Sequence, residues 1–192
     1  IKPDYADAYY NIGNTLKDQD NLDEAIDSYK KALCINPNYV NAHYNMGIAL
    51  KEQGKQEEAI EAYNKALLIN PGATEAHRNL STISRYTADD LHFKQVLDLI
   101  DDEGLGEDAR CNLSFALAKM HEDIGELDKF FEHLSEGNRL RKKALAYSIE
   151  DDITLFMQLK KVQPNLQKYS LELKKTSGNL TPIFIVGMPR SG

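Results

Sequence analysis

The residues of this sequence with the clearest chemical potential lie at its carboxyl end. Residues 187–192 have the spacing G-x-x-x-x-G, and they follow a continuous apolar run, residues 183–186, that is typical of a buried parallel strand. A loop that follows a strand in this way points successive backbone N–H groups at a bound phosphate. The alternative is an ordinary Gly-Pro turn after a buried strand. We therefore expect residues 182–192 to open an α/β domain that continues beyond Gly192.

The elements before this loop follow from a block of residues that occurs twice. Eight positions recur 34 residues apart with the same or a comparable type: Tyr9 and His43, Ile12 and Met46, Gly13 and Gly47, Leu16 and Leu50, Ala25 and Ala59, Tyr29 and Tyr63, Ala32 and Ala66, and Pro37 and Pro71. Their spacing predicts two helices per block, and the proline ends the second helix. This period is the signature of the tetratricopeptide repeat (TPR), whose helical hairpins stack into a superhelix with a concave inner surface.

We predict an all-α fold, a TPR superhelix of helical hairpins, that ends in the first strand and phosphate loop of a truncated α/β domain. The predicted segments are the tail of an earlier repeat at 1–3, regular repeats at 4–37 and 38–71, a degenerate repeat at 72–105, a diverged helical hairpin at 106–148, a helical linker at 149–181 and the phosphate-loop domain at 182–192. In the degenerate repeat we expect a second helix over about 89–101, capped by Thr87 or Asp89. In the linker, Pro164 predicts a break.

Three asparagines share the 34-residue spacing and are expected on the concave side: Asn11, Asn45 and Asn79. An amide both donates and accepts hydrogen bonds, so such a ladder can hold the backbone of an extended peptide whatever its side chains. The residues expected to flank the ladder are Tyr10, Tyr44, Asn14, Lys17 and Lys51. The alternative is that each asparagine satisfies its own helix or turn and recurs because the repeats share descent.

A resemblance supports the groove hypothesis. The first two repeats resemble those of the O-linked N-acetylglucosamine transferase superhelix, whose inner asparagines bind peptide backbone. They differ from the carboxylate-clamp repeats that bind chaperone C-termini, because Tyr10 stands where a lysine is needed and Glu75 where a basic residue is expected. The resemblance thus implies a protein or peptide partner other than a chaperone C-terminus.

A second resemblance concerns residues 182–192, which are similar to the sulfotransferase loop that binds the 5′-phosphosulfate of PAPS (3′-phosphoadenosine 5′-phosphosulfate). Repeats, further helices and then this loop resemble the TPR-containing sulfotransferase family of bacteria, through residues 77–80, 86–90, 131–134 and 136–140. The resemblance implies that Arg190, Ser191 and Gly192 contact the phosphosulfate and that Arg190 stabilises charge as the sulfuryl group leaves. No catalytic residue of that family falls within this chain. A P-loop kinase is the alternative enzyme. Its phosphate loop has the same G-x-x-x-x-G spacing and continues with Lys and Ser or Thr, at positions that would follow Gly192.

The charged residues are unevenly distributed along the chain. Residues 1–137 carry 13 Lys and Arg against 26 Asp and Glu, a net −13, whereas residues 138–192 carry 10 against 4, a net +6. The acidic part argues against a nucleic-acid partner, which requires a basic surface. The five histidines and the two cysteines, Cys34 and Cys111, show no metal-ligand spacing, so we expect no metal.

No apolar run is long enough to cross a bilayer, and the N-terminus lacks the pattern of a signal peptide, so we expect a cytoplasmic protein without a membrane partner. The hypothesis that combines these features is a protein-binding TPR arm of a PAPS-dependent sulfotransferase, with the fragment itself inactive. The alternatives are a non-catalytic TPR scaffold and the arm of a P-loop kinase. The exposed ends of the repeat stack would allow a homodimer.

Overall fold

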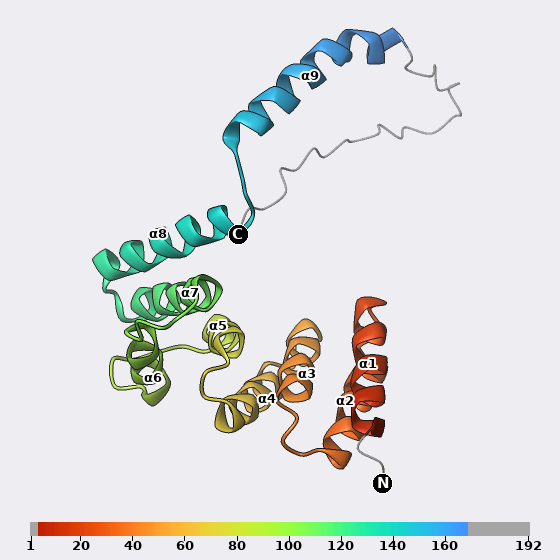
Figure 1. Ribbon diagram of the computed structural model, residues 1–192, viewed down its shortest axis with the longest axis vertical. Helices are drawn as coiled ribbons and strands as arrows, with labels where there is room; N and C mark the ends of the chain where they lie inside the picture. The colour runs from red at the N-terminus through yellow and green to blue at the C-terminus, as the bar shows by residue number, and fades with distance from the viewer. Residues whose placement is uncertain (1–3, 169–192) are drawn as a thin grey trace, which may run out of the picture. The chain divides into compact units, whose positions relative to one another are not determined.

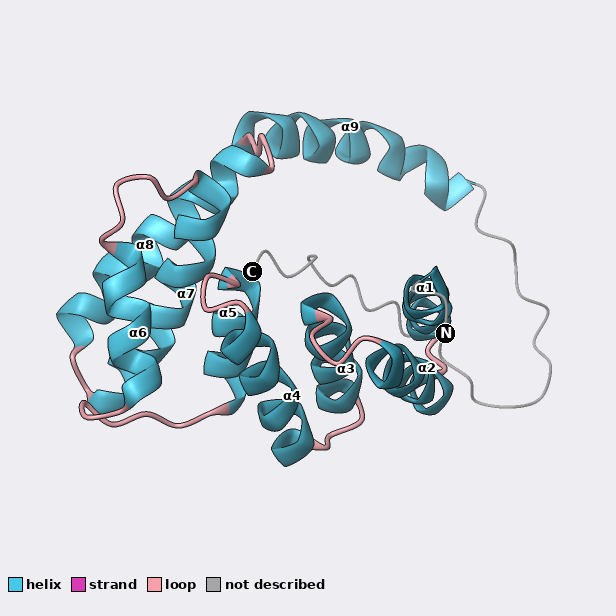
Figure 2. Ribbon diagram, turned by 60° about the horizontal axis from the view of Figure 1, so that its bottom comes forward, coloured by secondary structure: helices cyan, strands magenta, loops and turns pink. Residues whose placement is uncertain are grey.

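The computed structural model describes residues 4–168, and every regular element in that range is a helix (Figures 1 and 2). The helices are α1 (Asp4–Asp18), α2 (Leu22–Ile35), α3 (Val40–Glu52), α4 (Gln56–Ile69), α5 (Thr74–Ile83), α6 (Leu91–Ile100), α7 (Glu107–Ile124), α8 (Leu127–Ala144) and α9 (Ile149–Lys168). The all-helical repeat architecture is therefore confirmed. The predicted repeat tail at 1–3 and the predicted strand and phosphate loop at 182–192, with Arg190, Ser191 and Gly192, lie outside the described residues.

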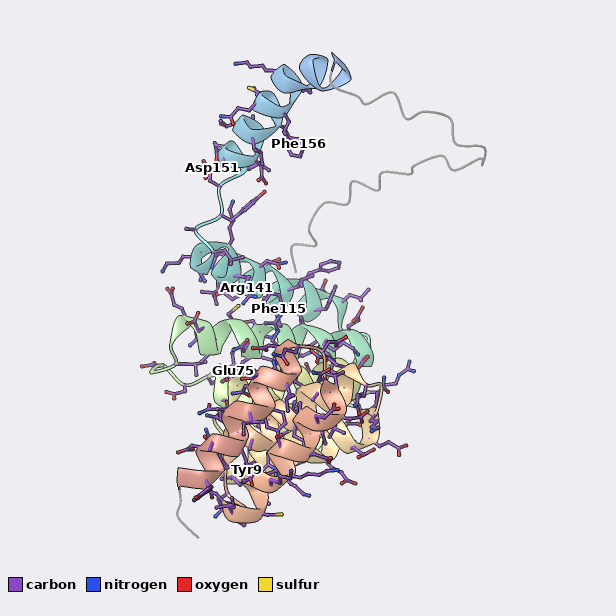
Figure 3. The ribbon with its side chains drawn as sticks, turned by 90° about the vertical axis from the view of Figure 1, so that its right-hand side faces the viewer. Tyr9, Glu75, Phe115, Arg141, Asp151 and Phe156 are labelled. Carbon is purple, nitrogen blue, oxygen red and sulfur yellow. The ribbon has the colours of Figure 1, made fainter. Side chains whose placement is uncertain are left out.

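The chain divides into two compact units, Ile1–Arg141 and Lys142–Gly192. In the first unit, α1 packs on α2 and α3 packs on α4 as antiparallel hairpins, and α2 packs on α3 to stack one hairpin on the next. Helices α1, α3 and α5 follow one another along one side of this unit, and α2 and α4 lie along the other side, below them in Figure 2. In the second unit, the side chains of α9 are largely exposed from residue 149 to residue 161, including Phe156, which is labelled in Figure 3.

Each regular hairpin closes around one glycine and one buried tyrosine. A Cβ placed on Gly13 would lie 2.6 Å from the ring of Tyr29, and a Cβ on Gly47 would lie 2.6 Å from the ring of Tyr63. Both tyrosines are fully buried, as are the alanines at the crossing, Ala25 and Ala59. Small residues at these positions thus allow the helices of a hairpin to approach closely around the aromatic ring.

The third repeat departs from this arrangement. Helix α5 has 10 residues, whereas α3 has 13, and its closest backbone packing is with α7, which is not its neighbour in sequence. Helix α6 also packs on α7, where Phe93 and Val96 join Leu113 and Leu117 in a second hydrophobic cluster. The first cluster ends at Leu80, so the core changes between α5 and α6.

Two local predictions were wrong. Helix α6 begins after Asp90, so Asp90, and neither Thr87 nor Asp89, occupies the N-cap position. The Asp90 carboxylate makes no capping bond to α6, and it accepts hydrogen bonds from the backbone N–H and the hydroxyl of Thr87. Helix α9 runs through Pro164 without the predicted break. A proline removes only its own N–H from the helical ladder, so the bonds on either side can continue the helix at some cost in stability.

Candidate functional site

The predicted ladder residues all lie on the first helices of the repeats. Asn11 and Asn14 are on α1, Asn45 is on α3 and Asn79 is on α5. Asn11 is exposed, and the other three are half-buried. The flanking residues Tyr10, Tyr44, Lys17 and Lys51 are half-buried on α1 and α3. The 34-residue spacing places Asn11, Asn45 and Asn79 at equivalent positions on the first helix of each repeat.

The side-chain amides connect one repeat to the next. Nδ2 of Asn45 donates to Oη of Tyr10 at 3.0 Å and to Oδ1 of Asn14 at 2.8 Å. Nδ2 of Asn79 donates to Oη of Tyr44 at 2.8 Å. Each of these asparagines therefore binds the tyrosine 35 residues before it. Sequence reasoning missed this bridge, although the Tyr-Asn pair at positions 10–11 and 44–45 could have indicated it.

The buried tyrosine hydroxyl of the first repeat is hydrogen-bonded, whereas that of the second repeat is not. Oη of Tyr29 donates to Oδ1 of Asn14 at 2.9 Å, but the residue that corresponds to Asn14 in the second repeat is Ile48. The hydroxyl of Tyr63 is consequently buried without a hydrogen-bond partner among the described residues. Burial raises the pKa of both tyrosines, so both hydroxyls stay protonated. Within the described structure, the side-chain amide of Asn79 makes only the bond to Tyr44, so its second N–H and its Oδ1 have no partner.

Charged groups around the ladder are held by neighbouring side chains. Nζ of Lys51 donates to Oγ1 of Thr82 at 2.8 Å, and Nζ of Lys17 lies 3.4 Å from a carboxylate oxygen of Asp18. The guanidinium of Arg78 lies 4.7 Å from the centre of the Phe115 ring. Figure 3 labels Phe115 on α7 and Glu75 on α5, and the Glu75 charge helps burial to raise the pKa of Tyr44. The face therefore offers mainly amides, hydroxyls and aromatic rings.

Four histidines form two pairs with nearly parallel rings, which the scattered positions in the sequence did not indicate. The ring centres of His77 and His92 are 5.0 Å apart, and those of His121 and His133 are 5.3 Å apart. Burial lowers the pKa of all four, and that of His92 falls to about 4. Among the described residues, no cluster of His, Cys, Asp or Glu is arranged to hold a metal ion.

The pair His77–His92 belongs to a directional chain of hydrogen bonds. The Pro71 carbonyl can only accept, so Nε2 of His77, 2.7 Å away, carries the proton. Nδ1 of His77 then accepts from Nε2 of His92 at 2.8 Å, and Nδ1 of His92 accepts from the hydroxyl of Tyr86 at 2.8 Å. Both rings are neutral in this arrangement, and every ring nitrogen is paired.

Comparison with known families agrees with this geometry. Residues 13–54 match a family model described as TPR repeat, and residues 40–72 match one described as tetratricopeptide repeat. The chain contains TPR repeats. No curated protein sequence matches it. In the part of the chain that the structure describes, no helix combines the length and the apolar character needed to span a membrane.

Several solved structures share this fold. MamA is similar with a TM-score of 0.54 and 19% identity over 76% of this chain and 84% of its own. PilF of Pseudomonas aeruginosa is similar with a TM-score of 0.57 and 19% identity over 86% of this chain and 74% of its own. YrrB, described as a TPR protein with an unusual peptide-binding site, is similar with a TM-score of 0.50 and 21% identity over 69% of this chain and 66% of its own.

Proposed function

We propose that this chain is a protein-interaction module that binds an extended peptide segment along α1, α3 and α5. Hydrogen-bonding groups left unpaired on these helices support the proposal most directly. Asn11 is exposed with no side-chain hydrogen bond to another described residue, and Asn79 uses one of its two N–H groups. An extended peptide backbone presents alternating donors and acceptors, which match such amides without regard to side-chain identity. The peptide-binding site named for YrrB is consistent with this class of partner.

Binding can be tested on an array of immobilised synthetic peptides with the labelled 192-residue chain as the probe. We expect the triple change of Asn11, Asn45 and Asn79 to Ala to abolish binding to the peptides that the unaltered chain captures. Since Asn45 and Asn79 also connect repeats, Asn11→Ala alone is the informative variant. It should weaken binding without changing the midpoint of thermal unfolding. The control is Asn138→Ala, an exposed asparagine on α8. Unchanged binding by both Asn11→Ala and the triple variant would contradict the proposal.

A more specific function rests on sequence alone. We propose that the complete protein transfers a sulfuryl group from PAPS to an acceptor selected by the repeats, because residues 182–192 resemble a phosphosulfate-binding loop. Arg190, Ser191 and Gly192 would hold the phosphosulfate, and all three lie outside the described residues. Calorimetry of the complete protein with the desulfated cofactor provides the test, and Arg190→Ala should abolish the heat of binding. A Lys-Ser or Lys-Thr directly after Gly192 would favour the kinase alternative. A non-catalytic scaffold would show no heat of binding with the desulfated cofactor.

A further inference from the structure

A second surface of the first unit has the properties of a docking site. A hollow of about 580 Å³ lies between α4 and α6, and its apolar walls include Leu67, Leu68, Leu91 and Leu99. Leu68 is 84% exposed and Leu91 is 71% exposed, the highest values among the large apolar side chains that the structure describes. Exposed leucines beside an apolar hollow are typical of an interaction surface.

This hollow is separate from the asparagine ladder. Its α5 residue is His77, which is two positions before Asn79 and therefore on nearly the opposite side of that helix. The corresponding hollow one repeat earlier contains Leu33, Pro37 and His43 and has a volume of about 340 Å³. The site is thus enlarged where the repeat geometry changes at α5 and α6.

The floor of the hollow is apolar in effect although it contains two histidines. His77 and His92 are neutral, and each of their ring nitrogens is used in the chain of hydrogen bonds from Tyr86 to Pro71. A ligand would therefore find no unpaired polar group on these rings. Apolar side chains can cover these two rings without leaving a ring nitrogen unsatisfied.

Asp98, on α6, is the one charged residue among the described residues that line the hollow. Glu61, on the turn of α4 before the lining residue Asn64, is exposed on the same helical face. Of the nearby lysines, Lys65 lines the smaller hollow one repeat earlier, and Lys94 lies 3.9 Å from the Asp89 carboxylate. Neither Asp98 nor Glu61 has an ion-pair partner among the described residues. A second copy of this acidic unit would place like charges against each other, whereas a basic segment would complement these two carboxylates.

From these observations we propose that the hollow between α4 and α6 docks an apolar segment of a partner protein in which leucine-sized side chains alternate with lysine or arginine. The leucines of the partner fill the hollow between Leu68 and Leu91, and its basic residues face Glu61 and Asp98. This surface is separate from the proposed peptide-binding face, so an experiment can contradict either proposal without affecting the other.

The probe for the test is a fluorescein-labelled synthetic peptide in which leucine alternates with lysine, compared with the same peptide in which glutamate replaces lysine. Fluorescence polarisation with the 192-residue chain should show binding of the lysine peptide and little binding of the glutamate peptide. The double variant Leu68→Ala/Leu91→Ala should weaken binding at least about tenfold, because these side chains are central to the contact. The control is Leu127→Ala, an exposed leucine of α8 that should leave binding unchanged.

The contribution of charge is tested with the variant Glu61→Gln/Asp98→Asn. This variant should bind the lysine peptide more weakly, and its affinity should depend less on salt concentration. Equal binding of the two peptides, or binding that survives the double leucine change, would overturn the proposal. Light scattering, which measures the oligomeric state, tests whether a second copy of this chain occupies the hollow instead. A dimer of the unaltered chain that dissociates in the double leucine variant would show that a second copy fills the hollow, which also overturns it.

Discussion

At the scale of single residues, the two regular repeats differ where Asn14 is replaced by Ile48. Asn14 accepts hydrogen bonds from Tyr29 and Asn45, whereas Ile48 can accept none, and the Tyr63 hydroxyl is left unpaired. An unpaired buried hydroxyl costs roughly 1–3 kcal/mol, which is more than a typical paired one contributes. The two tyrosines therefore form a natural pair for comparison.

We predict that Tyr29→Phe lowers the free energy of unfolding by about 0.5–1.5 kcal/mol, because it removes a satisfied hydrogen bond. Tyr63→Phe should leave the free energy unchanged or raise it by up to about 1 kcal/mol, because it removes an unsatisfied group. Urea unfolding followed by circular dichroism measures both. Equal destabilisation by the two changes would mean that the Tyr63 hydroxyl is bonded in solution.

A backbone position gives a second prediction at this scale. Gly54 and Gly125 end helices α3 and α7 with positive φ values of 77° and 81°, and Asp20, which corresponds to Gly54 in the first repeat, has a φ of 62°. Because an L-residue is strained there, Asp20→Gly should raise the free energy of unfolding by about 0.5–1 kcal/mol. Gly54→Ala is the matched change and should lower it by about 1 kcal/mol. Thermal unfolding of both variants measures the effect, and a loss of stability in Asp20→Gly would refute the argument.

At the scale of the elements, α6 is joined to α5 by the contact between His92 and His77. Burial, and to a smaller extent the neighbouring His77, lower the pKa of His92 to about 4, and Asp90 opposes this shift. The folded pKa lies below the ordinary value of 6.5, so the unfolded chain binds a proton more readily. Stability from this group is complete above pH 6.5 and is lost as the pH falls from 6.5 toward 4.

We therefore predict that the urea midpoint falls between pH 7 and pH 4.5, and that His92→Gln makes this fall smaller. Carboxylates with lowered pKa values, such as Glu126 and Glu136, act in the same direction in both proteins and cancel in the comparison. The measurement is the difference in midpoint between the two proteins at each pH. An identical pH dependence would show that His92 is protonated in the folded state as easily as in the unfolded one.

At the scale of the whole molecule, the buried core belongs to the first unit. The last buried residue in the described structure is Leu140, one position before the boundary at Arg141. We predict that residues 1–141 alone give a helical circular dichroism spectrum, with the signal of α9 lost, and keep the unfolding midpoint of the 192-residue chain. A midpoint lowered by several degrees would mean that residues 142–192 stabilise the first unit.

The sequence by itself determined the repeat period, the helical hairpins and the positions of Asn11, Asn45 and Asn79. These depend on helical spacing, on small residues at crossings and on prolines, which act through local geometry. It also supplied the phosphosulfate-loop hypothesis, which remains a prediction because residues 182–192 lie outside the described structure.

Only the tertiary structure decided how the polar groups of these helices are paired. The bonds from Asn45 and Asn79 to tyrosines of the preceding repeat, the pairing of His77 with His92 and the packing of α5 on α7 all join residues distant in sequence. Such contacts depend on how one hairpin is offset against the next, and residue spacing within a single helix carries no information about that offset.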